Sequence, residues 1–237
     1  MVPKTAKERF EIVSKFIGFG NPHAPIWFIG IEEGKPWDKD PDKDQEQYDK
    51  YARRWFPAES GEIKTQAERD GRSYTKIYDI MSKLIMLINP TGQDLAEWKN
   101  FRNEKLLRAD GMAFQSNLFP LGKPSDDGEW PLYYKDLFGY GNENRDEYER
   151  IVKAERFPLL RSEWKNHAPK ITVCFGSKRR NYFEDLLTPS GQCEAFNNCK
   201  VYEKSGIVLT PFFKPTDMPD SLIHKLAEKL RPFYARS

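Results

Sequence analysis

The chain of 237 residues contains only three cysteines, Cys174, Cys193 and Cys199. Their number is odd and none of them forms a C-x-x-C pair, which argues against a disulfide framework, a four-cysteine metal site and an iron–sulfur cluster. We therefore expect reduced thiols in a cytoplasmic protein.

The sequence also lacks long apolar runs and a charge of one dominant sign. No segment reaches the roughly 18 apolar residues that a membrane span requires, and the first ten residues, MVPKTAKERF, lack the apolar region of a signal peptide. The 38 Lys and Arg residues nearly balance the 36 Asp and Glu residues. We expect a soluble protein without a membrane partner, in which any nucleic-acid binding depends on a local basic patch.

Aromatic residues are plentiful at 14 % of the chain, and they supply large buried areas. Apolar segments of strand length alternate with segments of helical period, which is typical of a parallel sheet flanked by helices. The expected strands cover residues 26–31, 112–121, 171–175 and 207–213, the last preceded by a hairpin arm at 201–204. The prediction is one α/β domain over residues 1–237, a three-layer α/β/α sandwich with a short, mainly parallel central sheet. Two polar insertions interrupt it at about 35–70 and 122–145, the first carrying a surface helix.

Unusual polar residues follow three of the expected strands. Glu32 and Glu33 lie in the turn GIEEG between Gly30 and Gly34, Asn117 follows the second strand, and Lys214-Pro215-Thr216-Asp217 follows the last. Ligands of open parallel sheets bind just beyond the carboxyl ends of the strands. The sequence therefore predicts a binding site built from these turns.

The order of these motifs resembles the uracil-DNA glycosylase superfamily. GIEEG resembles the family's Gly-x-x-x-Gly turn, SNLFPLGKP resembles its Ser/Thr-Asn-Leu strand end, and FKPTD stands where the family has His-Pro-Ser before a C-terminal helix. The resemblance spans residues 26 to 231, apart from the two insertions. It implies base excision from DNA in DNA repair, without a cofactor.

The resemblance implies that Glu32 is the catalytic residue of the turn, with Glu33 as the reserve. Cleavage of an N-glycosidic bond passes through an oxocarbenium-like sugar, so a carboxylate can orient water or balance positive charge. Gly30 and Gly34 bracket this turn at the substrate. In the alternative interpretation, both glutamates only cap a helix N-terminus.

Asn117 resembles the family's base-recognition asparagine, because its amide offers a donor and an acceptor to a uracil-like base. Asn is also common in turns, which is the alternative. Tyr74, Phe56 and Trp37 are candidates for stacking on the flipped base, although core packing is favoured for each of them.

The last motif departs from the family, because Lys214 replaces the His and Thr216 replaces the Ser. The lysine ammonium can still stabilise an anionic leaving base, and the threonine hydroxyl can bind a phosphate. Alternatively, Lys214 is a solvated charge, and Thr216 or Asp217 caps the last helix. The three histidines lie outside the motifs and receive no role. We expect neither metal nor cofactor.

Binding to DNA requires local cations. Lys178, Arg179 and Arg180 follow the third strand at a helix N-terminus and are candidate phosphate contacts, with Arg53 and Arg54 as a second cluster. Clusters of this kind are usually solvated surface.

These observations predict a monomeric, monofunctional hydrolase, a DNA glycosylase acting on a uracil-type or modified pyrimidine base. The alternative is a non-catalytic nucleic-acid or nucleotide binding protein that keeps the glycosylase fold after losing the family's His.

Overall fold

The computed structural model describes residues 3, 5–32, 36–59, 62, 72–89, 94–123, 129–140 and 145–235. Its strands are β1 (Gly18–Gly20), β2 (Ile26–Gly30), β3 (Trp55–Phe56), β4 (Ala113–Asn117), β5 (Ile171–Phe175), β6 (Cys193–Phe196), β7 (Cys199–Tyr202) and β8 (Ile207–Thr210). Its α-helices are α1 (Ala6–Lys15), α2 (Gln45–Tyr51), α4 (Arg72–Ile88), α5 (Trp98–Glu104), α6 (Tyr134–Phe138), α7 (Arg145–His167), α8 (Arg180–Leu187) and α9 (Asp220–Tyr234). Short 3₁₀ helices are η1 (Pro41–Asp44), η2 (Leu95–Glu97) and η4 (Ser177–Arg179).

The strands form one eight-stranded sheet in the order β3-β1-β4-β2-β5-β8-β7-β6. Strand β5 pairs in parallel with β2 and β8, whereas β1 pairs with β4, β7 with β8 and β6 with β7 in antiparallel fashion. The α/β class is confirmed. The prediction of a short, mainly parallel sheet is wrong, because short antiparallel strands extend it at both edges into a long, mixed sheet.

The expected core strands are recovered as β2, β4, β5 and β8, and the expected hairpin as β7 and β8. The added strands have no strand-like pattern in the sequence. β1 reads Gly-Phe-Gly, and most of β6 is exposed, so neither presents the alternating apolar residues that indicate a strand.

The chain divides into two compact units. Unit 1 comprises Met1–Gly18, Gly30–Phe56 and Asn117–Asn166, and unit 2 comprises Phe19–Ile29, Pro57–Ser116 and His167–Ser237. Each unit is described by itself below, and the expected single domain stays a prediction.

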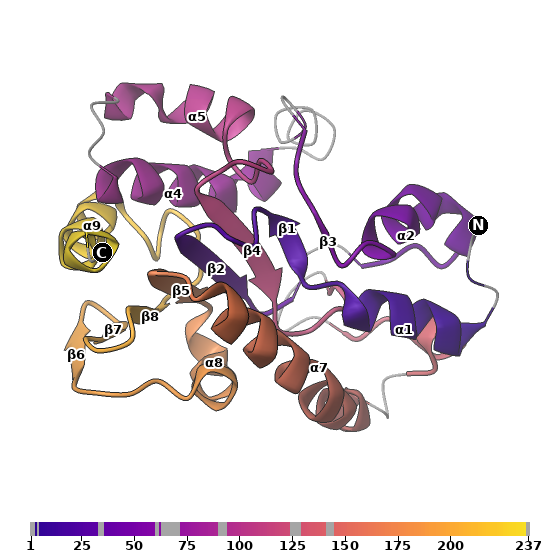
Figure 1. The fold of residues 1–237 in the computed structure, drawn as a ribbon. Coiled ribbons are helices and arrows are strands. Elements are labelled where there is room, and N and C mark those ends of the chain that lie inside the picture. The colour runs from indigo at the N-terminus through magenta and orange to yellow at the C-terminus, as the bar shows by residue number, and fades with distance from the viewer. Residues whose placement is uncertain are drawn as a thin grey trace. The chain divides into compact units, whose positions relative to one another are not determined.

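Unit 2 holds a core between the sheet and helices α4 and α9, which Figure 1 shows next to each other. Along β2, Ile26 and Phe28 join this core, while the alternate residues Trp27 and Ile29 are buried as well. All five residues of β5 are buried too. Strands that are buried on both faces appear in sequence as continuous apolar runs, which is why these two were predictable.

Aromatic side chains form much of the core of unit 1. The ring of Trp37 lies 4.7 Å from that of Tyr48 and 5.2 Å from that of Tyr51, and the ring of Tyr51 stacks on Phe16 at 4.0 Å. Trp37 is therefore a core residue and not a stacking platform for a base. Because Tyr48 and Tyr51 of α2 are buried, the helix in the first insertion is half-buried and not purely a surface helix.

Helix α1 begins with the capping box that its sequence indicates. The backbone N–H of Glu8 donates to Oγ1 of Thr5 at 3.2 Å, and the N–H of Thr5 donates to Glu8 Oε2 at 3.0 Å. No helix within the described residues has the length and apolar character needed to cross a membrane.

Candidate functional site

The residues that follow β2 and β4 run side by side in unit 1. The N–H of Leu118 donates to the carbonyl of Gly30 at 3.0 Å, and the N–H of Phe119 donates to the carbonyl of Ile31 at 2.8 Å. These bonds place the residues that follow β2 beside those that follow β4, at the same end of the two strands.

This end of β2 is also where the strand order of the sheet reverses. From β2 the chain continues to β4 on one side, and β5 and β8 then follow on the other side of β2. Such a switch point separates the two outgoing loops and leaves room for a ligand beyond the carboxyl ends of the strands. Glu32 follows β2 at this point, and Asn117 ends β4, a neighbour of β2 in the sheet.

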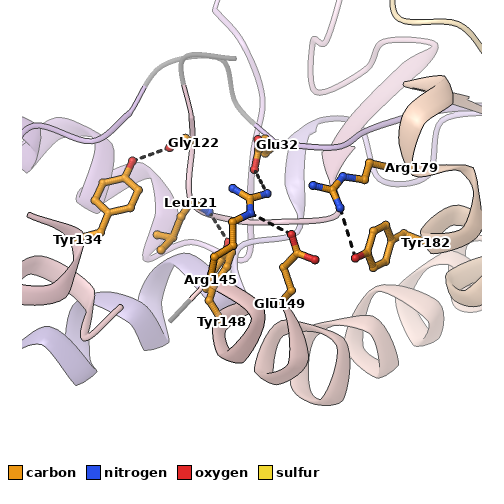
Figure 2. Close-up of polar contacts among 9 residues, drawn as sticks. All are labelled: Glu32, Leu121, Gly122, Tyr134, Arg145, Tyr148, Glu149, Arg179 and Tyr182. Carbon is orange, nitrogen blue, oxygen red and sulfur yellow. Dashed lines mark hydrogen bonds and ion pairs between the residues drawn. The ribbon is translucent and has the colours of Figure 1, made fainter. Parts of the chain in front are cut away.

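The carboxylate of Glu32 belongs to a buried ionic cluster in unit 1 (Figure 2). Only 7 % of its side chain is exposed, and its Oε2 atom lies 3.6 Å from Nη2 of Arg145. Nε of Arg145 donates to Oε1 of Glu149 at 3.0 Å, and the guanidinium stacks on the ring of Trp130 with its Cζ 4.9 Å from the centroid. We call Glu32, Arg145, Glu149 and Trp130 the Glu32 cluster.

In the Glu32 cluster, the carboxylates of Glu32 and Glu149 both face the guanidinium of Arg145. A buried carboxylate is stable only with a compensating charge or hydrogen bonds, and Arg145 supplies the charge here. Nη1 and Nη2 of Arg145 are buried, yet neither has a hydrogen-bond partner within the described part of the chain. Buried donors of this kind require an explanation, and a bound ligand oxygen is one.

Arg156 fixes the backbone at Asn117 from the same helix, α7. Only 3 % of this residue is exposed. Its Nη2 donates to the carbonyl of Asn117 at 3.0 Å, and its Nε donates to the carbonyl of Leu118 at 3.1 Å. Its Nη1 donates to the carbonyls of Ser14 and Phe16, both at 2.6 Å. A single guanidinium thus anchors the strand end to the segment after α1.

Two buried tyrosines of unit 1 hold the loop that follows Asn117 (Figure 2). The hydroxyl of Tyr148 accepts from the N–H of Leu121 at 3.1 Å, and the hydroxyl of Tyr134 donates to the carbonyl of Gly122 at 2.6 Å. Complete burial raises the pKa of Tyr148 well above 10, so its hydroxyl stays protonated. These contacts give the loop a fixed course beside the Glu32 cluster.

The helix-cap interpretation of Glu32 stays a prediction, because residues 33–35 lie outside the described residues. Residues 36–40 after the turn are not helical, and η1, the next helix, begins with Asp40 as its N-cap. Asp40 accepts from the N–H of Asp42 at 3.2 Å. Glu33 and Gly34 lie outside the described residues, so their predicted roles stay predictions.

The stacking candidates are only partly described. Tyr74 lies in α4, but its side chain is outside the described part of the structure. Phe56 of unit 1 is half-buried, and the cations of Lys50 and Arg53 lie 5.3 Å and 5.1 Å from its ring centroid. Phe56 therefore already has cation–π partners.

Lys214 and Thr216 lie in a turn of unit 2 that follows β8. The side chain of Lys214 is 54 % exposed, and its ammonium lies 3.4 Å from Oδ2 of Asp217. The hydroxyl of Thr216 donates to Oδ1 of Asp217 at 3.2 Å. The alternative that Thr216 or Asp217 caps the last helix is wrong, because Pro219 occupies the N-cap of α9. The expected convergence of Lys214 with Glu32 and Asn117 stays a prediction.

The basic residues after β5 have different surroundings within unit 2. The guanidinium of Arg179 stacks on Tyr182, with Cζ 5.4 Å from the ring centroid, and its Nη1 donates to the tyrosine hydroxyl at 3.4 Å (Figure 2). Arg180 donates to the carbonyl of Asn198, whereas Lys178 is exposed. The role of Lys178, Arg179 and Arg180 as phosphate contacts stays a prediction.

A cavity of about 350 Å³ in unit 2 contains none of the predicted site residues. Its lining mixes apolar residues of α4 and α5, such as Ile85 and Phe101, with the charged residues Lys105, Arg108 and Asp110. Opposite charges on its rim leave no clear preference for a ligand, and we assign it no function.

In the described ranges, no group of three or more His, Cys, Asp or Glu residues could hold a metal ion. Cys174 and Cys199 are buried, and burial raises the pKa of Cys199 to about 11, which keeps it a thiol.

No protein-family model matches the chain, and no curated protein sequence matches it.

Proposed function

We propose that the chain is a monofunctional DNA glycosylase that hydrolyses the N-glycosidic bond of a uracil-type or modified pyrimidine base. The observation that carries this proposal is the Glu32 cluster: a carboxylate held in a fixed, buried ion pair at the switch point of the sheet, next to the turn of Asn117. An ion pair that only stabilises the fold could lie at many other positions, whereas the ligand site of an α/β sheet is expected at this one.

The chemistry assigned to Glu32 follows from its charge and confinement. As the bond from the sugar carbon to the base nitrogen breaks, the base leaves with the electron pair and the sugar becomes cationic. The carboxylate of Glu32 balances this charge or orients the water that adds to the sugar carbon, and it accepts the proton that the water loses. Arg145 acts as a positioning residue, because it holds the Glu32 carboxylate in one place.

Recognition of the base is assigned to Asn117. Arg156 and the strand pairing fix its backbone, so its amide is presented in a defined place for the pairing edge of a flipped base. The buried N–H groups of Arg145 suit an additional carbonyl oxygen of the substrate. We assign to Lys214 the stabilisation of the anionic leaving base. Thr216, Lys178 and Arg179 are assigned contacts with phosphates of the DNA.

We also infer a three-layer α/β/α arrangement around the central strands. It is supported by β2 and β5, in which residues of both faces are buried, so each face needs a covering layer.

A non-catalytic DNA or nucleotide binding protein is the second candidate. It is favoured by the ion pair of Glu32 with Arg145, because a nearby guanidinium reduces the negative charge available to a cationic transition state. The lysine at the family's His position favours it too. An enzyme that has lost its activity but still binds its ligand would keep these turns, even with its carboxylate neutralised by an arginine.

The two candidates differ in turnover. The chain is incubated with single- and double-stranded oligonucleotides that carry uracil, 5-hydroxymethyluracil, xanthine or hypoxanthine, and abasic sites are revealed by alkali. The proposed function predicts release of a pyrimidine base and strand breaks only after alkali, because water and not an amine adds to the sugar carbon in a monofunctional enzyme. No release from any of these substrates, together with salt-sensitive binding, would favour the binding protein.

A further inference from the structure

We propose that His23 and His167 form a binding site for one divalent transition-metal ion of the Zn²⁺ or Cu²⁺ class. Both residues belong to unit 2, and the Nδ1 atoms of their imidazole rings lie 3.3 Å apart. The site is independent of the Glu32 cluster and of the proposed glycosylase activity.

The separation of the two nitrogens matches a metal site. With Zn–N bonds of about 2.0–2.1 Å, two ligands of a tetrahedral ion lie about 3.3–3.4 Å apart. The same distance is long for a hydrogen bond between nitrogens. A metal ion between the two rings would use the lone pair of each Nδ1 atom.

The ring orientations permit coordination after a small adjustment. The ring centroids are 4.5 Å apart and the planes make an angle of 85°. The χ2 torsion of histidine has a broad energy well, so a modest rotation of each ring directs both lone pairs to one point. The two nitrogens then supply two ligands and water molecules supply the others. The site therefore has fewer protein ligands than a structural zinc centre.

The turn that carries His23 is held in place before any metal binds. The side-chain oxygen of Asn21 accepts from the N–H of His23 at 3.0 Å, and its amide nitrogen donates to the carbonyl of Gly111 at 3.0 Å. The indole N–H of Trp27 donates to the carbonyl of Pro22 at 3.0 Å. A preformed ligand position lowers the entropic cost of binding.

His167 is positioned by the C-terminal end of α7 and by a neighbouring aromatic ring. It is the last residue of α7, and Ala168 ends the helix with a positive φ of 46°. Its ring lies 5.9 Å from the ring of buried Trp27. The C-terminal end of a helix carries a negative partial charge, which stabilises a cation bound there.

The small number of histidines makes their NMR signals easy to assign. The sequence has three histidines, and the third, His224, is exposed on α9 and provides a matched control. Zn²⁺ is titrated into the full chain near pH 7.5, while calorimetry and the imidazole signals of the NMR spectrum are recorded.

The expected result is one ion per chain that shifts the signals of His23 and His167 and leaves those of His224 unchanged. His23→Gln and His167→Gln each weaken binding by at least about tenfold, whereas His224→Gln has no effect. Cu²⁺ binds more tightly than Zn²⁺, and Mg²⁺ does not compete. His23→Gln in an exposed turn keeps the test valid if His167→Gln fails to fold.

Two results would overturn the proposal. One is unchanged signals of His23 and His167 up to about 1 mM Zn²⁺. The other is loss of binding in His224→Gln to the same degree as in His23→Gln, which would place the ion elsewhere.

Discussion

The charges at the two predicted ends of the site differ in burial between the units. In unit 1, Glu32 meets Arg145 with 7 % and 17 % of the two side chains exposed, whereas in unit 2, Lys214 meets Asp217 with 54 % and 35 % exposed. A buried pair fixes its geometry and is costly to break, while an exposed pair contributes little to stability and can change partners. The comparison indicates that the carboxylate of Glu32 in unit 1 is preorganised and that the ammonium of Lys214 in unit 2 is adaptable.

The largest effect on stability is expected at Arg145. Arg145→Met keeps an unbranched apolar stem but removes the cation that pairs with the carboxylates of Glu32 and Glu149, so unfolding should become easier by about 3–5 kcal/mol. Urea unfolding measures the change. Arg150→Met, which removes an exposed arginine from the same helix, is the control and should unfold like the parent. A parental midpoint for Arg145→Met would show that the cluster is not effectively buried.

DNA affinity tests the cations of unit 2. Exchange of Lys178 and Arg179 for Ala removes two expected phosphate contacts, so binding should weaken by roughly 10²-fold near 0.1 M salt and the salt slope should fall by about 2. Binding isotherms at several salt concentrations measure both quantities. Lys225→Ala, an exposed lysine on α9, is the control. Unchanged affinity would move the DNA path elsewhere, with Arg53 and Arg54 as the next candidates.

Two tyrosines of unit 1 should respond in opposite directions. The buried hydroxyl of Tyr48 has no hydrogen-bond partner among the described residues, so Tyr48→Phe should stabilise the chain by about 1 kcal/mol. Tyr148→Phe removes the acceptor of the Leu121 N–H and should destabilise it by a similar amount. Thermal unfolding shows whether each variant is more or less stable than the parent. Destabilisation by Tyr48→Phe would show that the Tyr48 hydroxyl forms a stabilising hydrogen bond.

The same tyrosines predict a loss of stability in alkali. Burial raises the folded-state pKa of both hydroxyls above the unfolded value of about 10, so the unfolded chain ionises first as the pH rises. Their contribution to stability is complete below about pH 10 and is lost above it. Each Phe variant should therefore lose less stability than the parent between neutral pH and pH values above 10, which urea unfolding at several pH values measures.

The smallest effect on stability is expected at Lys214. Lys214→Gln breaks an exposed pair with Asp217, which should change the free energy of unfolding by less than about 1 kcal/mol. If the lysine stabilises the leaving base, the same variant should still lower the rate of base release. A loss of stability as large as that of Arg145→Met would remove the difference between the two units.

The central strands were predictable because burial on both faces makes a strand a continuous apolar run bounded by turn residues. Strands β2 and β5 illustrate this, whereas β1 and β6 could not be found, since short edge strands form through pairing with their neighbours. The pattern of the inner strands led to a short parallel sheet and could not reveal the antiparallel edges.

The candidate site was only partly predictable for a related reason. Glu32 and Asn117 could be located because they follow apolar strands directly. Arg145 and Arg156 were missed, because their partners are far away in sequence and a charged residue of a helix is usually solvated. One signal was available: Tyr148 and Val152 precede Arg156 at intervals of four residues, which places an arginine on the buried face of α7.

The most direct test of the role of Glu32 is the single-turnover rate of base release by Glu32→Gln. This variant keeps the shape of the side chain and removes its charge, so the rate should fall by roughly 10²–10⁴-fold while DNA affinity changes little. The unfolding midpoint should fall as well, because the ion pair with Arg145 is broken, and the rate is therefore measured at a temperature at which the variant is folded. Glu147→Gln, an exposed glutamate of α7, serves as the control and should keep the parental rate. Base release by Glu32→Gln at the parental rate would contradict the catalytic role of the Glu32 cluster.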